Sequence, residues 1–123
     1  MPKALVVDDS RAMRLIVAGT LRDLGFEILE AANGQEALDQ LGRDPSIELI
    51  LCDWNMPVMN GLDFIRQLRS DGRFSSSLVV MVTTETETEQ MIRALDAGAN
   101  EYVMKPFTRE TIEEKLRLLG AVH

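Results

Sequence analysis

The sequence predicts a doubly wound α/β fold, in which helices cover both faces of one five-stranded parallel sheet. Short apolar runs alternate with helical patterns five times along the chain, and no linker or internal repeat interrupts them. The runs are too short for helices, and Leu78–Val82 is apolar throughout, as expected of a strand covered on both faces. Strands that are separated by helices run parallel, through right-handed crossovers.

The first half of the chain holds three strand–helix pairs. The run Ala4–Val7 predicts a buried strand, and the helix after it precedes Gly25, a suitable C-terminal cap. Asn33-Gly34 and Asn60-Gly61 mark turns before the next two helices. The predicted ranges are strand 4–7, helix 11–24 with Met13, Val17, Leu21 and Leu24 on one face, strand 27–31, helix 35–41 with Ala37, Leu38 and Leu41 inward, strand 47–52, and a helix carrying Leu62, Ile65 and Leu68.

The second half adds two further pairs after the polar loop Ser75–Ser77. The strand Leu78–Val82 is followed by Thr86–Glu89, which fits a capping box at the start of a helix that ends before Gly98. Thr108 can cap the final helix. The remaining predicted elements are a helix with Met91, Ile92 and Leu95, strand 101–104, and a helix with Ile112, Leu116 and Leu119 on one face.

Length and composition fit one compact domain spanning residues 1–123. The net charge of -7 argues against nucleic acid as a partner, because a duplex-binding domain needs a basic face. Cys52 is the only cysteine, which excludes an internal disulfide, and its apolar neighbours predict a buried thiol. We see no signal peptide and no membrane span, so we expect a cytoplasmic protein. Met1 and the late end of the last helix favour a complete chain.

Polar side chains follow four of the five predicted strands. Asp8-Asp9, Asp53, Thr83-Thr84 and Lys105-Pro106 come at these ends, whereas the second strand ends in two alanines. In a doubly wound sheet, ligands bind outside the carboxyl ends of the strands, where the strand order reverses. We therefore expect these side chains to meet at one rim of the sheet.

Three carboxylates at one rim need a cation. Two unit charges about 4 Å apart interact by about 4 kcal/mol at an effective dielectric constant of roughly 20. Lys105 supplies one positive charge, and oxygen ligands without histidine or a second cysteine suit Mg²⁺, Mn²⁺ or Ca²⁺ rather than zinc. The single histidine, His123, is the last residue. A carboxylate, a hard metal, a lysine and a hydroxyl are the parts of a phosphoryl-transfer site, in which isolated Asp53 is the best-placed nucleophile.

Each of these signals also has an ordinary structural interpretation. An Asp-Asp pair after a strand is often only a helix N-cap. Lys105-Pro106 alone reads as an exposed turn, and Thr83 alone as a hydrogen-bonding side chain. The chemical interpretation rests on their common position at one rim.

The motifs of the chain resemble the receiver domain of two-component response regulators. They cover essentially its whole length, and within the family the chain is most similar to single-domain, CheY-like chemotaxis regulators. This resemblance implies the strand order 2-1-3-4-5. The motifs are Val7-Asp8-Asp9-Ser10, Asp53-Trp54-Asn55-Met56-Pro57, Asn60-Gly61, Val82-Thr83, Gly98-Ala99 and Lys105-Pro106-Phe107, with Tyr102 and residues 108–116 carrying the likeness to the chemotaxis group.

The resemblance also implies roles for single residues. Asp53 would take a phosphoryl group from a phosphohistidine of a partner histidine kinase. Asp8, Asp9, Asp53 and the backbone carbonyl of Asn55 would bind Mg²⁺. Thr83 and Lys105 would contact the phosphoryl oxygens, with a cis bond before Pro106. Tyr102 would move with Thr83 and reshape the face of the fourth helix, fifth strand and fifth helix, to which a downstream protein binds. For chemotaxis regulators that protein is the flagellar motor switch, and a phosphatase is a further candidate partner.

The site neighbours contain departures from the family pattern. Thr84 stands where many relatives carry Ala or Gly, and its bulk is expected to narrow the access to Asp53. Trp54 flanks Asp53, and the family suggests that Asn55 and Glu85 set the lifetime of an acyl phosphate. Thr86 and Thr88 make the start of the fourth helix small and polar, which affects which partners dock there.

The sequence fits three other functions less well than a receiver that relays a signal without turning over a substrate. A Mg²⁺-dependent phosphatase with an aspartyl phosphate usually has a general-acid Asp two residues after the nucleophile, where this chain has Asn55. An adaptor that no longer takes phosphate is disfavoured by the intact residue set. A dinucleotide-binding domain would need a glycine-rich loop after the first strand.

Overall fold

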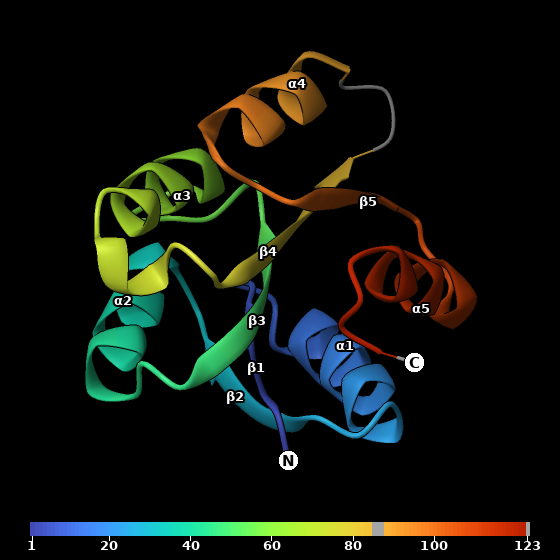
Figure 1. Cartoon of the computed structure of the whole chain (residues 1–123). Coiled ribbons are helices and arrows are strands. Elements are labelled where there is room, and N and C mark those ends of the chain that lie inside the picture. The colour runs from blue at the N-terminus through green and yellow to red at the C-terminus, as the bar shows by residue number, and fades with distance from the viewer. Residues whose placement is uncertain (85–87, 123) are drawn as a thin grey trace.

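The computed structural model describes residues 1–84 and 88–122. In these ranges strands and helices alternate along the chain (Figure 1). The elements are β1 (Lys3–Val7), α1 (Arg11–Asp23), β2 (Glu27–Ala31), α2 (Gly34–Arg43), β3 (Ile47–Asp53), α3 (Gly61–Arg69), the short 3₁₀ helix η1 (Gly72–Phe74), β4 (Leu78–Thr84), α4 (Thr88–Ala97), β5 (Glu101–Lys105) and α5 (Arg109–Leu118).

The five strands of the described residues form one parallel sheet in the order β2-β1-β3-β4-β5. This confirms the predicted fold class and strand order. The order reverses between β1 and β3, so the carboxyl ends of these two strands flank the crevice in which such folds bind ligands. β3 lies at the centre, and every residue from Leu49 to Asp53 is buried.

Helices cover both faces of the sheet, and each face has its own hydrophobic core. Figure 1 shows α1 and α5 on one side and α2, α3 and α4 on the other. Val17 and Ile112 belong to the α1–α5 core, and Leu41, Phe64 and Ala94 belong to the other. Successive strand residues point to opposite faces, which is why the β-strands contribute alternately to the two cores.

Side-chain caps fix where several helices begin. Ser10, Asn33, Asn60 and Thr108 each accept a hydrogen bond from the backbone amide three residues further on. Such a bond satisfies one of the amides that have no partner within the first turn. The predicted cap at Thr108 is confirmed. Ser10, and neither aspartate before it, caps α1, so the interpretation of Asp8-Asp9 as a helix cap is wrong.

The structure departs from the predicted elements in a few places. α2 extends past the predicted end at Leu41 to Arg43, and the 3₁₀ helix η1 was not predicted. Ile92 and Leu95 are exposed by 54% and 42%, because the face that α4 turns to the sheet is centred on the buried Ala94. The predicted capping box begins at Thr86, which lies outside the described residues. Cys52 is a fully buried free thiol, as predicted.

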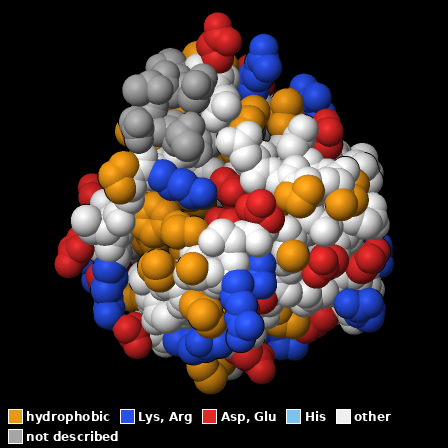
Figure 2. Space-filling view, turned by 180° about the vertical axis from the view of Figure 1, so that it is seen from behind, with side chains coloured by type: hydrophobic (Ala, Val, Ile, Leu, Met, Phe, Trp, Pro, Cys, Tyr) orange, Lys and Arg blue, Asp and Glu red, His pale blue; other side chains and the backbone are white. Residues whose placement is uncertain are grey.

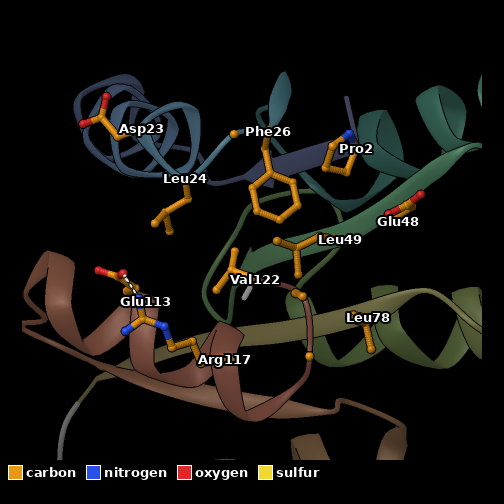
Figure 3. A pocket seen from close by; sticks show the side chains of 13 residues that line it. Pro2, Asp23, Leu24, Phe26, Glu48, Leu49, Leu78, Glu113, Arg117 and Val122 are labelled. Atoms are coloured by element: carbon orange, nitrogen blue, oxygen red, sulfur yellow. Dashed lines mark hydrogen bonds and ion pairs between the residues drawn. The ribbon is translucent and has the colours of Figure 1, made fainter.

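A pocket of about 610 Å³ opens at the amino ends of the strands, where Phe26, Leu49, Leu78 and Val122 line it (Figure 3). It lies at the opposite end of the sheet from the predicted rim, since Leu78 is the first residue of β4. Two of its charged lining residues, Arg117 and Glu113, form an ion pair within α5. Among the residues described, no helix is both long and apolar enough to cross a membrane.

Candidate metal centre at the carboxyl ends of the strands

The parallel sheet brings the predicted carboxylates together. Asp8 and Asp9 follow β1, and Asp53 is the last residue of β3, the strand next to it. One carboxylate oxygen from each of the three residues lies within 4.8 Å of the others. Asp8 and Asp53 are each only 6% exposed, whereas Asp9 is exposed to solvent. The cluster therefore has a buried base and an open side.

Lys105 faces this cluster from the end of β5. Its ammonium nitrogen lies 3.3 Å from Oδ1 of Asp53 and 3.9 Å from Oδ2 of Asp8. The peptide bond between Lys105 and Pro106 is cis, as the resemblance implied. One ammonium against three carboxylates leaves the site with an excess of negative charge.

Burial shifts the titration of the two inner carboxyls. Burial raises the pKa of Asp53 above its ordinary value, and Asp9 adds to the rise. The charge and hydrogen bond of Lys105 and the amide of Asn55 oppose it. Burial also raises the pKa of Asp8, which the amide of Ser10 opposes. A divalent cation would relieve the cost of keeping these groups ionised, because it supplies the missing positive charge.

The donor atoms fit a hard cation. The cluster offers carboxylate oxygens only, which is the ligand type that Mg²⁺ prefers. Asp9 and Asn55 line an open pocket of about 460 Å³ together with Met56, Pro57 and Asn60. This pocket leaves room beside the carboxylates for a metal and its water ligands.

Thr83 supplies a hydroxyl with unused hydrogen-bonding capacity. It lies in β4 directly after Val82, the residue paired with Asp53. Thr83 is 1% exposed, and its Oγ1 has no hydrogen-bond partner among the described residues. An unpaired buried hydroxyl costs roughly 1–3 kcal/mol. An incoming oxygen at the rim is therefore a favourable partner for it.

The remaining predicted residues lie around the site to different extents. Trp54 is half-buried against the α2–α3–α4 core, and its amide donates to the carbonyl of Val82. Tyr102 is half-buried in β5, three residues before Lys105. The backbone of Thr84 pairs with Lys105, but its side chain lies outside the described part, as does Glu85. The effects predicted for these two side chains stay predictions.

The structure adds two residues that the sequence did not indicate. Arg14 donates to the carbonyl oxygen of Asp8 at 2.7 Å and forms an ion pair with Glu30 at 3.1 Å, so it fixes the backbone that carries Asp8. A Cβ atom at Gly61 would lie 2.6 Å from the carbonyl oxygen of Asp53. The Asn60-Gly61 pair indicated a turn, but no pattern in one sequence indicates this close approach.

An apolar hollow borders the site on the α1 side. Met13, Ile16, Pro106 and Phe107 line it beside Lys105, with a volume of about 410 Å³. In the space-filling view, apolar side chains gather in a patch next to acidic and basic ones (Figure 2). The acidic rim and the apolar hollow are therefore adjacent, with Lys105 at their border.

Comparison with known families agrees with this geometry. Residues 4–117 match the family model of the response regulator receiver domain. The chain therefore belongs to the response regulator receiver family, whose members are signalling proteins of phosphorelays. The predicted family and fold are confirmed.

The similar proteins include chemotaxis regulators. Chemotaxis protein CheY1 of Helicobacter pylori is 47% identical over 118 residues, which cover 95% of each chain. A chemotaxis protein CheY homolog of Campylobacter jejuni is 44% identical over 115 residues, 93% of this chain and 88% of the relative. Among solved structures, chemotaxis response regulator CheY4 of Vibrio cholerae is 37% identical with a TM-score of 0.88, covering 97% of this chain and 98% of that one.

Proposed function

We propose that residues 1–123 form one receiver domain that accepts a phosphoryl group on Asp53 from a histidine kinase, with the help of Mg²⁺. The observation that carries this proposal is the meeting of Asp8, Asp9 and Asp53 within 4.8 Å, with Lys105 3.3 Å from Asp53. A buried carboxylate beside a cation site and a lysine is poised for in-line attack on phosphorus.

The roles follow from the position of each group. Asp8, Asp9, Asp53 and the backbone carbonyl of Asn55 would hold Mg²⁺, which neutralises charge on the moving phosphoryl group. A carboxylate oxygen of Asp53 forms a bond to phosphorus as the bond from phosphorus to the donor imidazole nitrogen breaks. The electron pair of that bond stays on the imidazole. The product is an acyl phosphate on Asp53 and an unphosphorylated histidine on the donor.

Lys105 and Thr83 would stabilise the product. The ammonium of Lys105 already lies next to Asp53 and can pair with a phosphoryl oxygen. Oγ1 of Thr83, which has no hydrogen-bond partner among the described residues, can donate a hydrogen bond to a second phosphoryl oxygen. A phosphoryl group adds nearly two negative charges and three strong acceptors, which is enough to pull β4 and its neighbours toward a second arrangement.

The output would be a changed face formed by α4, β5 and α5, with Tyr102 as the residue that moves with Thr83. The chemotaxis proteins among the relatives support chemotaxis as the pathway, and the flagellar motor switch as a partner of this face. A phosphatase is a further partner of the site. This function implies a cytoplasmic protein. The protein would catalyse only its own phosphorylation and dephosphorylation, because the side-chain amide of Asn55 cannot donate and recover a proton as the general acid of a phosphatase does.

The first prediction concerns phosphate transfer itself. Incubation with a small phosphodonor and Mg²⁺ should add the mass of one phosphoryl group, as measured by intact-protein mass spectrometry. Asp53→Asn should show no gain, and wild type with a chelator should show little. An equal gain in wild type and Asp53→Asn would show that Asp53 is not the acceptor.

A further inference from the structure

Tyr102 lies in β5, which pairs only with β4 and forms an edge of the sheet among the described residues. Its ring is half-buried and packs against the core under α2, α3 and α4. The next strand residue, Val103, belongs to the core on the opposite face. The ring therefore lies on the α4 side of the sheet edge.

Lys115 reaches this ring from α5, the helix on the other face. Its ammonium nitrogen lies 4.7 Å from the centroid of the Tyr102 ring. That distance is within the range in which a cation is attracted to the negative face of an aromatic ring. The contact spans the edge of the sheet and joins α5 to the tyrosine.

Glu101 holds the ammonium in place. Its Oε1 lies 3.4 Å from Nζ of Lys115 and also accepts a hydrogen bond of 3.0 Å from the backbone amide of Tyr102. The side chains of Lys115 and Glu101 are only 25% and 20% exposed. The carboxylate is thus anchored by the strand that carries the tyrosine, and the lysine is anchored by the carboxylate.

We infer that Glu101 and Lys115 are positioning residues for Tyr102, which together resist rotation of its ring out of the present rotamer. This inference rests on the proposed function where it concerns signalling, because Tyr102 is the side chain that the proposed switch moves. The pair would then set how much of the protein adopts the other tyrosine rotamer before any phosphorylation. A cation over a partly exposed ring shifts a two-state ratio by about two- to fivefold.

The rotamer of Tyr102 can be measured without phosphate or metal. Tyr102 is the only tyrosine, so three-bond NMR couplings from its Cγ to its own backbone nitrogen and carbonyl carbon give its χ1 populations without ambiguity. The full-length chain would be compared with Lys115→Gln, Glu101→Gln, their double variant and Lys115→Arg. Arg117→Gln is the matched control, because Arg117 also forms an ion pair on α5, with Glu113.

Wild type should show one dominant rotamer. Lys115→Gln should lower the ratio of that rotamer to the others by about two- to fivefold. Glu101→Gln should lower it by less, and the double variant by no more than Lys115→Gln, because both residues act through one contact. Lys115→Arg, which keeps a cation, should stay near wild type, and Arg117→Gln should change nothing.

An unchanged ratio in Lys115→Gln, or an equal change in Arg117→Gln, would overturn the inference. Comparable rotamer populations in wild type would also overturn it. Failure of the proposed function is seen separately, as the absence of phosphoryl mass on Asp53 while the rotamer ratio still depends on Lys115.

Discussion

Asp8 and Asp53 each carry a stability cost in the folded protein. Both are buried, both lie against a further negative charge, and burial raises the pKa of each. A carboxyl whose pKa is higher in the folded than in the unfolded protein binds more protons when folded. These two groups therefore destabilise the folded protein when the pH is above their raised pKa. The cost disappears as the pH falls toward 3.8, the ordinary pKa of an aspartate.

A second prediction follows for Asp8→Asn. The amide keeps an oxygen for the Ser10 N–H but removes one charge from the cluster. In the presence of a chelator at pH 7, the free energy of unfolding should rise by about 1 kcal/mol. Urea denaturation at several pH values measures it, and the gain should shrink as the pH is lowered toward 4. Exposed Asp39→Asn is the control, and a loss of stability in Asp8→Asn at pH 7 would contradict the account.

Val58 provides a third prediction. It is 83% exposed and has a φ of 68°, a left-handed conformation in which a β-branched residue is strained. Asparagine tolerates this conformation, so Val58→Asn should raise the free energy of unfolding by about 1 kcal/mol. Chemical denaturation tests this, with Val58→Thr as the control because it stays β-branched. Equal stabilities of wild type and Val58→Asn would mean that the loop holds no such strain.

At the scale of single residues, the sequence predicted those site residues that stand at strand ends. Asp8, Asp9, Asp53 and Lys105 could be found because parallel strands expose their carboxyl ends at one rim. Arg14 could not, since its contact with Asp8 depends on how α1 and β2 pack. That Oγ1 of Thr83 has no hydrogen-bond partner within residues 1–84 and 88–122 likewise depends on packing, which no pattern in a single sequence contains.

At the scale of elements, the joint between β3 and α3 determines whether the site can form. The amide of Gly61 donates to the carbonyl of Trp54, and a Cβ atom at Gly61 would lie 2.6 Å from the carbonyl oxygen of Asp53. Any side chain at this position would push against the backbone of Asp53. The loop that carries Asn55 therefore depends on a residue that has no side chain.

The fourth prediction is that Gly61→Ala lowers the free energy of unfolding by about 1–3 kcal/mol, because the new Cβ meets backbone atoms that cannot move aside. Gly42→Ala is the matched control. Gly42 lies inside α2 with nothing within 4 Å of the added atom, so that variant should gain about 0.5–1 kcal/mol. Denaturant unfolding separates the two, and a neutral Gly61→Ala would contradict the close approach.

Strands were more predictable than helix faces. Each predicted strand lies within an observed one, because an apolar run of this length has one good structural solution in a covered sheet. For α4 the apolar residues Ile92 and Leu95 lie on the solvent side, and Ala94 makes the core contact. The apolar residues of α4 did not predict which of its faces packs on the sheet, because apolar side chains on an exposed face can serve binding instead of folding.

At the scale of the whole molecule, one sheet separates two cores and presents two different ends. The amino ends border a pocket lined by both apolar and charged side chains, and the carboxyl ends present the acidic cluster and Lys105. The polar groups of the candidate site therefore lie at one rim of the sheet, and the two hydrophobic cores on its faces stabilise the fold. β5 carries both Tyr102 and Lys105, and it therefore links the α4–β5–α5 face to this rim.

The central claim, that the acidic cluster is a divalent-cation site next to Asp53, is tested most directly by titrating Mg²⁺ and following the fluorescence of Trp54. Trp54 is the only tryptophan and adjoins Asp53 in the sequence. The account predicts a saturable change in wild type at millimolar Mg²⁺ that is strongly weakened in Asp9→Asn. An unchanged spectrum in wild type, or the same titration curve in Asp9→Asn, would contradict it.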